Sequence, residues 1–226
     1  MMPIRVLGPV FTFERIIAAR RWQGYALRSL FVAALLVGMT LIWWGQVAGK
    51  SGVVSIRAQA EIGQWYFYAL IGTQLALVLL AAPAFTAGSI CLDRSRGMLA
   101  HMLMTDLSDS EIVLGKLAAR LLPVFGLIAC ALPVLSLSTL LGGMDPLALG
   151  LAFLITTCLA LLGCTLALTL SVWAKKTHDV LMATYAVWVV LLLFQPIWEL
   201  VAMSGPGVAG PPSWVLHLNP FWLAFA

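Results

Sequence analysis

Five long runs of mostly apolar residues limit what this chain can fold into. A membrane-spanning helix needs about 20 such residues to cross roughly 30 Å of hydrocarbon, and each run is long enough. We therefore predict an all-α polytopic membrane protein. Its expected spans are 29–47, 65–92, 111–141, 145–174 and 179–203.

The overall composition supports the same class. Hydrophobic residues make up 62% of the 226 residues and charged residues 10%, whereas a soluble domain has about 25% charged residues. A soluble fold of this size could not hide so much apolar surface. The cysteines lie in or beside apolar runs and lack metal-ligand spacing, so we expect inert thiols rather than a disulfide framework: Cys91, Cys130, Cys158 and Cys164.

Lysine and arginine are distributed unevenly between the two sides that the spans define. Of the 13, only Lys50 and Arg57 lie in the first connection, and the other eleven lie before the first span, around the second connection or in the fourth. Cytoplasmic segments carry the excess of basic residues in membrane proteins. We therefore predict that the N-terminus, the 93–120 region and the 175–176 pair are cytoplasmic. The net charge of +4 then reflects topology, and no nucleic-acid partner is expected.

Two end segments are predicted to flank a transmembrane domain at 29–203. In 1–28, Phe13, Ile16 and Ile17 recur at helical spacing beside arginines. This pattern is typical of an amphipathic helix in the headgroup layer of the bilayer, and the alternative is a charged flank to the first span. Residues 204–226 combine a Gly/Pro-rich stretch with an apolar end too short to cross, so we expect a non-cytoplasmic loop.

The sequence also predicts where some helices begin and where they kink. Ser108 and Glu111 form an S-x-x-E capping box, which satisfies free N–H groups where a helix begins. Asp145 followed by Pro146 provides an N-cap acceptor and a first-turn proline. Prolines inside the spans each remove a backbone hydrogen bond and are expected to kink their helices: Pro83, Pro123 and Pro133.

Residues suited to catalysis or ligand binding are sparse. The three histidines have no metal-ligand spacing, and Glu199 falls near the end of the fifth span. GQVAGKS, from Gly45 to Ser51, resembles a phosphate-binding loop but has three residues between its glycines where that motif needs four. We expect no catalytic residue, metal or cofactor. Hydroxyls in the spans are expected to bond between helices: Ser136, Ser138, Thr139, Thr156, Thr157, Thr165 and Thr169.

The segment 93–110 places charged residues between two of the most apolar runs. Its first half has Met98, Leu99, Met102 and Leu103 at helical spacing, with polar residues between them. A methionine-rich face suits a surface that repacks against a moving partner. A helix lying on lipid has the same pattern, so composition leaves both readings open.

The stretch APAFTAGSICLDRSRGMLAHMLMTDLSDSEIVLGK, from Ala82 to Lys116, resembles permease subunits of ABC-2 type ATP-binding-cassette transporters. In those permeases a Pro-Ala-rich stretch leads into an acidic-Arg pair, Gly-Thr-Leu, a short helix, a Leu-Ser turn and Glu-Ile-Val-x-Gly-Lys. Here Asp93-Arg94 corresponds to the acidic-Arg pair, and Met98 replaces the threonine. The likeness covers about residues 8–200 and is most specific across 82–143.

The resemblance implies a membrane permease in a bacterial plasma (inner) membrane, paired with a second permease subunit. Export would be driven by a cytoplasmic ATPase subunit that docks on 93–110, while this chain itself is no enzyme. The residues implied in docking, or in fixing the ends of the docking helix, are Asp93, Arg94, Arg96, Gly97, Met98, Leu99, Met102, Leu103, Glu111 and Lys116. The alternatives are a secondary transporter and a non-transporting membrane scaffold. Family permeases usually have six spans or more, so we expect this five-span chain to be part of a longer protein.

Overall fold

A computed structural model describes residues 11–12, 16, 22–47, 56–95, 97, 104, 109–140, 146–174, 176–204, 212, 215–216 and 219–225. The elements with bounds among these residues are helices, and none of the described residues is in a strand. The long helices are α2 (Trp22–Val47), α3 (Ile56–Thr86), α6 (Asp109–Leu140), α7 (Pro146–Trp173) and α8 (Thr177–Ser204), and the short ones are α4 (Cys91–Ser95) and α10 (Pro220–Phe225). Within the described residues, five helices are long and apolar enough to cross a membrane. The predicted all-α polytopic class is therefore confirmed.

Local sequence signals set the start of two helices. α6 begins at Asp109, directly after Ser108 of the predicted capping box. α7 begins at Pro146, as expected for a first-turn proline. The long helices also contain four internal prolines, three of which were predicted to lie inside spans: Pro83, Pro123, Pro133 and Pro196.

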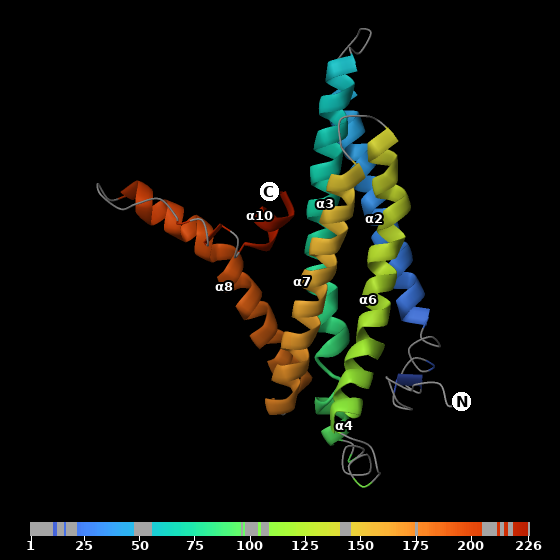
Figure 1. Ribbon diagram of the computed structural model, residues 1–226, viewed down its shortest axis with the longest axis vertical. Helices are drawn as coiled ribbons and strands as arrows, with labels where there is room; N and C mark the ends of the chain where they lie inside the picture. The colour runs from blue at the N-terminus through green and yellow to red at the C-terminus, as the bar shows by residue number, and fades with distance from the viewer. Residues whose placement is uncertain are drawn as a thin grey trace.

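α3 lies at the centre of the bundle, in contact with α2, α6, α7, α8 and α10 (Figure 1). Its buried Phe67, Leu70 and Ile71 pack against residues of α2, α6 and α7, which are Phe31, Leu35, Leu127, Ala131, Val134, Leu135 and Ala152. Further along α3, Val78 and Ala82 continue the core against Leu121, Val124, Ile128, Ala160 and Cys164. Lipid is as apolar as these side chains, so close packing rather than exclusion of water holds the helices together.

Polar contacts between helices gather beside Pro83. Proline has no N–H, so the carbonyl of Leu79, four residues before Pro83, loses its helical donor and the helix is weakened locally. The hydroxyl of Tyr185 in α8 donates to the carbonyl of Leu80 at 2.8 Å, and the thiol of Cys164 in α7 donates to that of Ala82 at 3.6 Å. The proline turn of α3 is thus an attachment point for α7 and α8.

Four hydroxyls that were predicted to bond between helices donate to a carbonyl of their own helix. Ser136, Thr156, Thr165 and Thr169 each donate to a carbonyl three or four residues earlier, at 2.7 to 2.9 Å. A threonine hydroxyl reaches the carbonyl of the preceding turn of its own helix without any neighbour. For these residues the prediction was wrong.

α8 diverges from the other four long helices (Figure 1). Its Trp188 is buried against Leu75 and Leu79 of α3 and Leu159 of α7. Only 17% of the span 177–203 is buried, compared with 56% of the span 63–94 in and after α3. α8 is therefore held to the bundle near Tyr185 and Trp188, while much of its length faces outward.

α10 lies in the angle between α8 and the bundle, where it contacts α3 and α7 (Figure 1). Its Phe221 packs against the cluster around Trp188. Just before α10, the side-chain amide of Asn219 donates to Oε1 of Gln195 at 2.8 Å, and the amide of Gln195 donates to Glu199 at 3.1 Å. This short helix thus braces α8 against α3 and α7.

The connections lie at two opposite ends of the bundle (Figure 1). α4, the start of α6 and the turn from α7 to α8 lie at one end, here called the α4 end, and α2 begins toward it. The second and fourth connections, predicted to be cytoplasmic, are therefore at the same end. Of the predicted end segment 1–28 the structure describes 11–12, 16 and the start of α2, and of 204–226 it describes 204, 212, 215–216 and 219–225, which include α10; the rest of both segments lies outside the described residues.

Gly163→Leu is expected to weaken the packing of α7 against α8. Gly163 is buried, and a Cβ there would lie 3.5 Å from Cζ2 of Trp188 and 3.6 Å from Cβ of Ala82. Overpacking of this kind costs about 1–3 kcal/mol, so the melting temperature in detergent should fall. Gly150→Leu in the same helix is the matched control, because a Cβ at Gly150 meets no atom within 4 Å. Equal melting temperatures for the two variants would contradict this packing.

Candidate functional site

The turn 87–90 interrupts the helical backbone between α3 and α4. α3 ends at Thr86 and α4 begins at Cys91. The N–H of Arg94 already donates to the carbonyl of Ile90 at 2.9 Å, so the backbone bonding resumes within the turn itself. The turn therefore starts a new short helix at the α4 end.

Ser171, near the end of α7, fixes the start of this short helix. Its hydroxyl oxygen accepts from the N–H of Ile90 at 3.3 Å and from the N–H of Cys91 at 3.1 Å. The thiol of Cys91 donates in turn to the carbonyl of Ala174 at 3.5 Å. The first N–H groups of a helix have no partner within it. A serine from another helix satisfies them here and ties α4 to α7.

Gly97 marks the far side of α4. It has a φ of +71°, and its N–H donates to the carbonyl of Arg94 at 3.2 Å. A residue in this left-handed conformation commonly follows the end of a helix, and glycine adopts it without the strain that a Cβ causes. The glycine of the predicted motif thus lies where the chain leaves α4.

An ion pair joins α4 to α6. The ammonium of Lys116, in the second turn of α6, contacts Oδ2 of Asp93 in α4. The Lys116 side chain is 0% exposed and the Asp93 side chain is 16% exposed. A buried ammonium is very costly without a counter-charge, so Asp93 is required where it is. The turn 87–90, α4, Gly97, residues 109–116 and residues 171–174 are together called the α4 junction.

The α4 junction unites some of the predicted site residues. It brings Asp93 and Lys116 into contact, leaves Arg94 exposed and holds Glu111 partly buried in the first turn of α6. The remaining predicted residues lie outside the described part of the chain: Arg96, Met98, Leu99, Met102 and Leu103. In the described part, no group of three His, Cys, Asp or Glu side chains could hold a metal ion. The junction therefore links α4 directly to α6 and to α7 through side-chain contacts.

Sequence reasoning missed two polar residues of the core. Ser171 is one hydroxyl residue among several in an apolar span, and its partners lie 80 and 81 positions earlier, so no local pattern indicates its role. Gln74 is 1% exposed in the middle of α3, and its Oε1 accepts no hydrogen bond within the described residues. A glutamine inside an apolar span is unusual, so Gln74 could have been identified from the sequence.

The chain matches a known protein family. The model of the family described as ABC-2 family transporter protein matches residues 46–226, which include the whole α4 junction. No curated protein matches the chain.

Asp93→Leu is expected to destabilise the protein more than the double variant Asp93→Leu with Lys116→Met. The single substitution removes the Asp93 carboxylate from a buried ammonium, and breaking a buried pair in this way costs about 3–5 kcal/mol, whereas two apolar residues pack without any charge to desolvate. The free energy of unfolding in mixed micelles measures both. Arg94→Ala, at an exposed neighbouring position, should stay close to wild type. If the single and double variants were equally unstable, the buried pair would be refuted.

Proposed function

Because the chain belongs to the ABC-2 family of transporter proteins, we propose that this membrane permease exports its substrate using ATP hydrolysed by a separate cytoplasmic subunit. The observation that carries the proposal is the ion pair between Asp93 and Lys116, buried at the end of the bundle where the partner would dock. ATP hydrolysis belongs to the partner, and this chain converts the partner's movement into movement of its helices.

The docking element is the segment 93–110, of which α4 is the beginning. Arg94 is exposed at the start of this segment. Arg96 adds a second cation, and Met98, Leu99, Met102 and Leu103 supply an adaptable apolar face. These roles come from the sequence pattern. The exposed position of Arg94, beside a firmly anchored Asp93, supports them.

The anchoring of α4 supports a mechanical role. A displacement of 93–110 is transmitted to α6 through the ion pair of Asp93 and Lys116. It is transmitted to α7 through the hydrogen bonds between Ser171 and the N–H groups of Ile90 and Cys91. α3 moves with them, since only the turn 87–90 separates it from α4. Three spanning helices therefore respond to one contact with the partner.

A second permease subunit, identical or homologous, completes the transporter in this proposal. Two outer helices support it, because only 11% of the window 24–41 in α2 and 17% of 177–203 in α8 is buried. The α4 end faces the cytoplasm of a bacterial cell, as the eleven basic residues assigned to that side indicate. The N-terminus lies on the same side.

The double variant Arg94→Asp with Leu99→Asp should abolish co-purification of the ATPase subunit in mild detergent. Charge reversal at the docking face repels the surface that met Arg94, and an aspartate in place of Leu99 has to be desolvated on binding. ATPase activity in the eluate measures the effect, and the yield of chain in the membrane controls for insertion.

Arg57→Asp is the matched control, because Arg57 lies in the first turn of α3, and α3 begins at the end of the bundle opposite α4 (Figure 1). It should keep the ATPase. Retention of the ATPase by the double variant would refute docking on 93–110. A wild-type preparation without any ATPase would favour a secondary transporter or a scaffold.

A further inference from the structure

The second half of α8 extends beyond the part of the helix that packs on the bundle (Figure 1). Leu191 still packs against the cluster around Trp188. Most of the large apolar residues that follow it in α8 are exposed: Leu193, Phe194, Ile197, Leu200, Val201 and Met203. Packing against α3 and α7 therefore does little to fix the direction of this half.

Pro196 weakens α8 within this half. Because proline has no N–H, the carbonyl of Leu192, four residues earlier, has no donor from its own helix. Helices bend most readily at positions of this kind. The side-chain amide of Gln195, which donates to Oε1 of Glu199 at 3.1 Å, bridges the turn that contains the proline. α8 is therefore weakened beside Gln195.

Asn219, directly before α10, uses both ends of its side-chain amide. Its Oδ1 accepts from the N–H of Phe221 at 3.0 Å, which caps the short helix. Its Nδ2 donates to Oε1 of Gln195 at 2.8 Å. Each end of the amide has a partner, so its orientation is fixed. The start of α10 is thereby attached to α8 beside Pro196.

The other attachment of α10 is to the bundle. Phe221 packs against the cluster formed by Leu75, Leu79, Leu159 and Trp188, and α10 contacts α3 and α7. A helix of six residues therefore joins the weakly packed half of α8 to the centre of the bundle.

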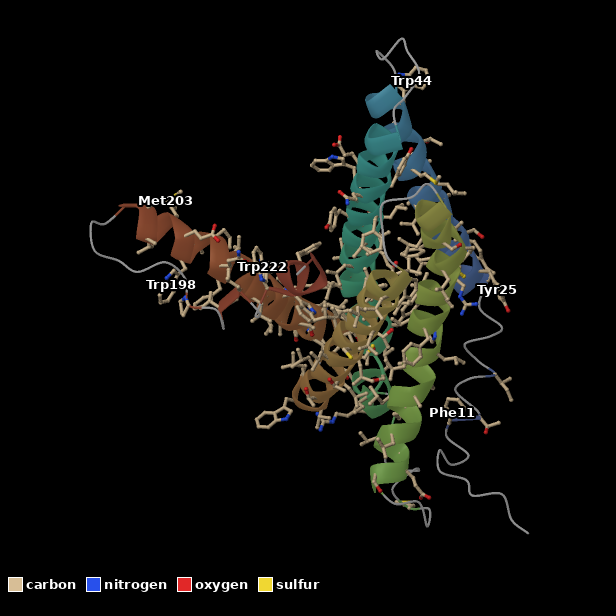
Figure 2. The ribbon with its side chains drawn as sticks, turned by 45° about the horizontal axis from the view of Figure 1, so that its top comes forward. Phe11, Tyr25, Trp44, Trp198, Met203 and Trp222 are labelled. Atoms are coloured by element: carbon tan, nitrogen blue, oxygen red, sulfur yellow. The ribbon has the colours of Figure 1, made fainter. Side chains whose placement is uncertain are left out.

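The length of α8 beyond its packed region amplifies any movement at this attachment. Trp188 and Met203 are about 22 Å apart along the helix axis, and Gln195 lies about halfway between them. A rotation of this part by about 10° moves its end by about 4 Å. Met203 lies toward the end of α8 that points away from the other long helices (Figure 2). A shift at Gln195 is thus about doubled at Met203.

We propose that α10 is a movable brace, and that the bond between Asn219 and Gln195 selects between two directions of the second half of α8. With the bond formed, α8 has the direction described above. With the bond broken, the second half turns about the packed residues Tyr185 and Trp188. This is a hinge movement of one helix that leaves the core of α3, α6 and α7 unchanged. It does not depend on whether an ATPase subunit docks on 93–110.

The test is double electron–electron resonance on the full chain in lipid nanodiscs, with two pairs of spin labels. Labels at the exposed residues Trp65 in α3 and Met203 in α8 report on the second half of α8, and labels at Trp65 and exposed Met182 report on the first half. The two cysteines that are not buried, Cys130 and Cys158, are first replaced by alanine.

Gln195→Leu removes the bond to Asn219 but keeps the cap of α10. The distance distribution between positions 65 and 203 should shift or broaden by about 4 Å, as for a rotation of about 10°. The distribution between positions 65 and 182 should stay as in the parent protein, which also shows that the variant is folded. Asn219→Leu should have the same effect, and the double variant no more than either, because all three lose the same bond.

Glu199→Leu is the matched control, because it removes the other bond of Gln195 and keeps the bond to Asn219. It should leave both distributions unchanged. An unchanged distribution between positions 65 and 203 in Gln195→Leu would refute the brace. An equal change in both distributions would refute the hinge, since α8 would then move as a whole.

Discussion

The helices of this protein are surrounded by lipid that is as apolar as their own side chains, so burying leucine against leucine orients them only weakly. Lys116 is different, because its fully buried ammonium requires an anion, and Asp93 supplies it. This requirement determines how α4 lies on α6. Ser171 then joins α4 to α7 by accepting the first N–H groups of the short helix.

α8 contrasts with this tightly bonded end. Its contacts with α3 are a hydroxyl bond from Tyr185 to Leu80 and the packing of Trp188, both in its first half. Beyond them it diverges from the bundle, with α10 in the angle between (Figure 1). In the proposed mechanism the α4 end moves as a unit, and α8, which is held to α3 through its first half, shifts without breaking the core.

The features that the sequence predicted are those that depend on local composition or spacing. The five spans follow from uninterrupted apolar runs, the start of α6 from Ser108 and Glu111, and the start of α7 from Pro146. Asp93 and Lys116 were selected through a family resemblance, but their contact depends on how α4 and α6 rotate about their axes. No sequence pattern gives that rotation.

The same limit explains what the sequence analysis missed or misassigned. Ser171 could not be distinguished from other span hydroxyls until the fold brought it to Ile90 and Cys91. Thr156 was expected to reach a neighbouring helix but bonds to Ala152 of its own. A polar residue in an apolar span can be identified from the sequence, whereas its hydrogen-bond partner depends on how the helices pack.

The central claim is that a nucleotide-binding subunit docks at the α4 end. Photo-crosslinking in native membranes tests it directly, with benzoylphenylalanine replacing exposed Arg94 in α4 or exposed Trp44 at the opposite end of the bundle (Figure 2). The account predicts an adduct that contains an ATP-binding subunit, identified by mass spectrometry, from position 94 alone. An adduct with that subunit from position 44, or none from position 94, would contradict it.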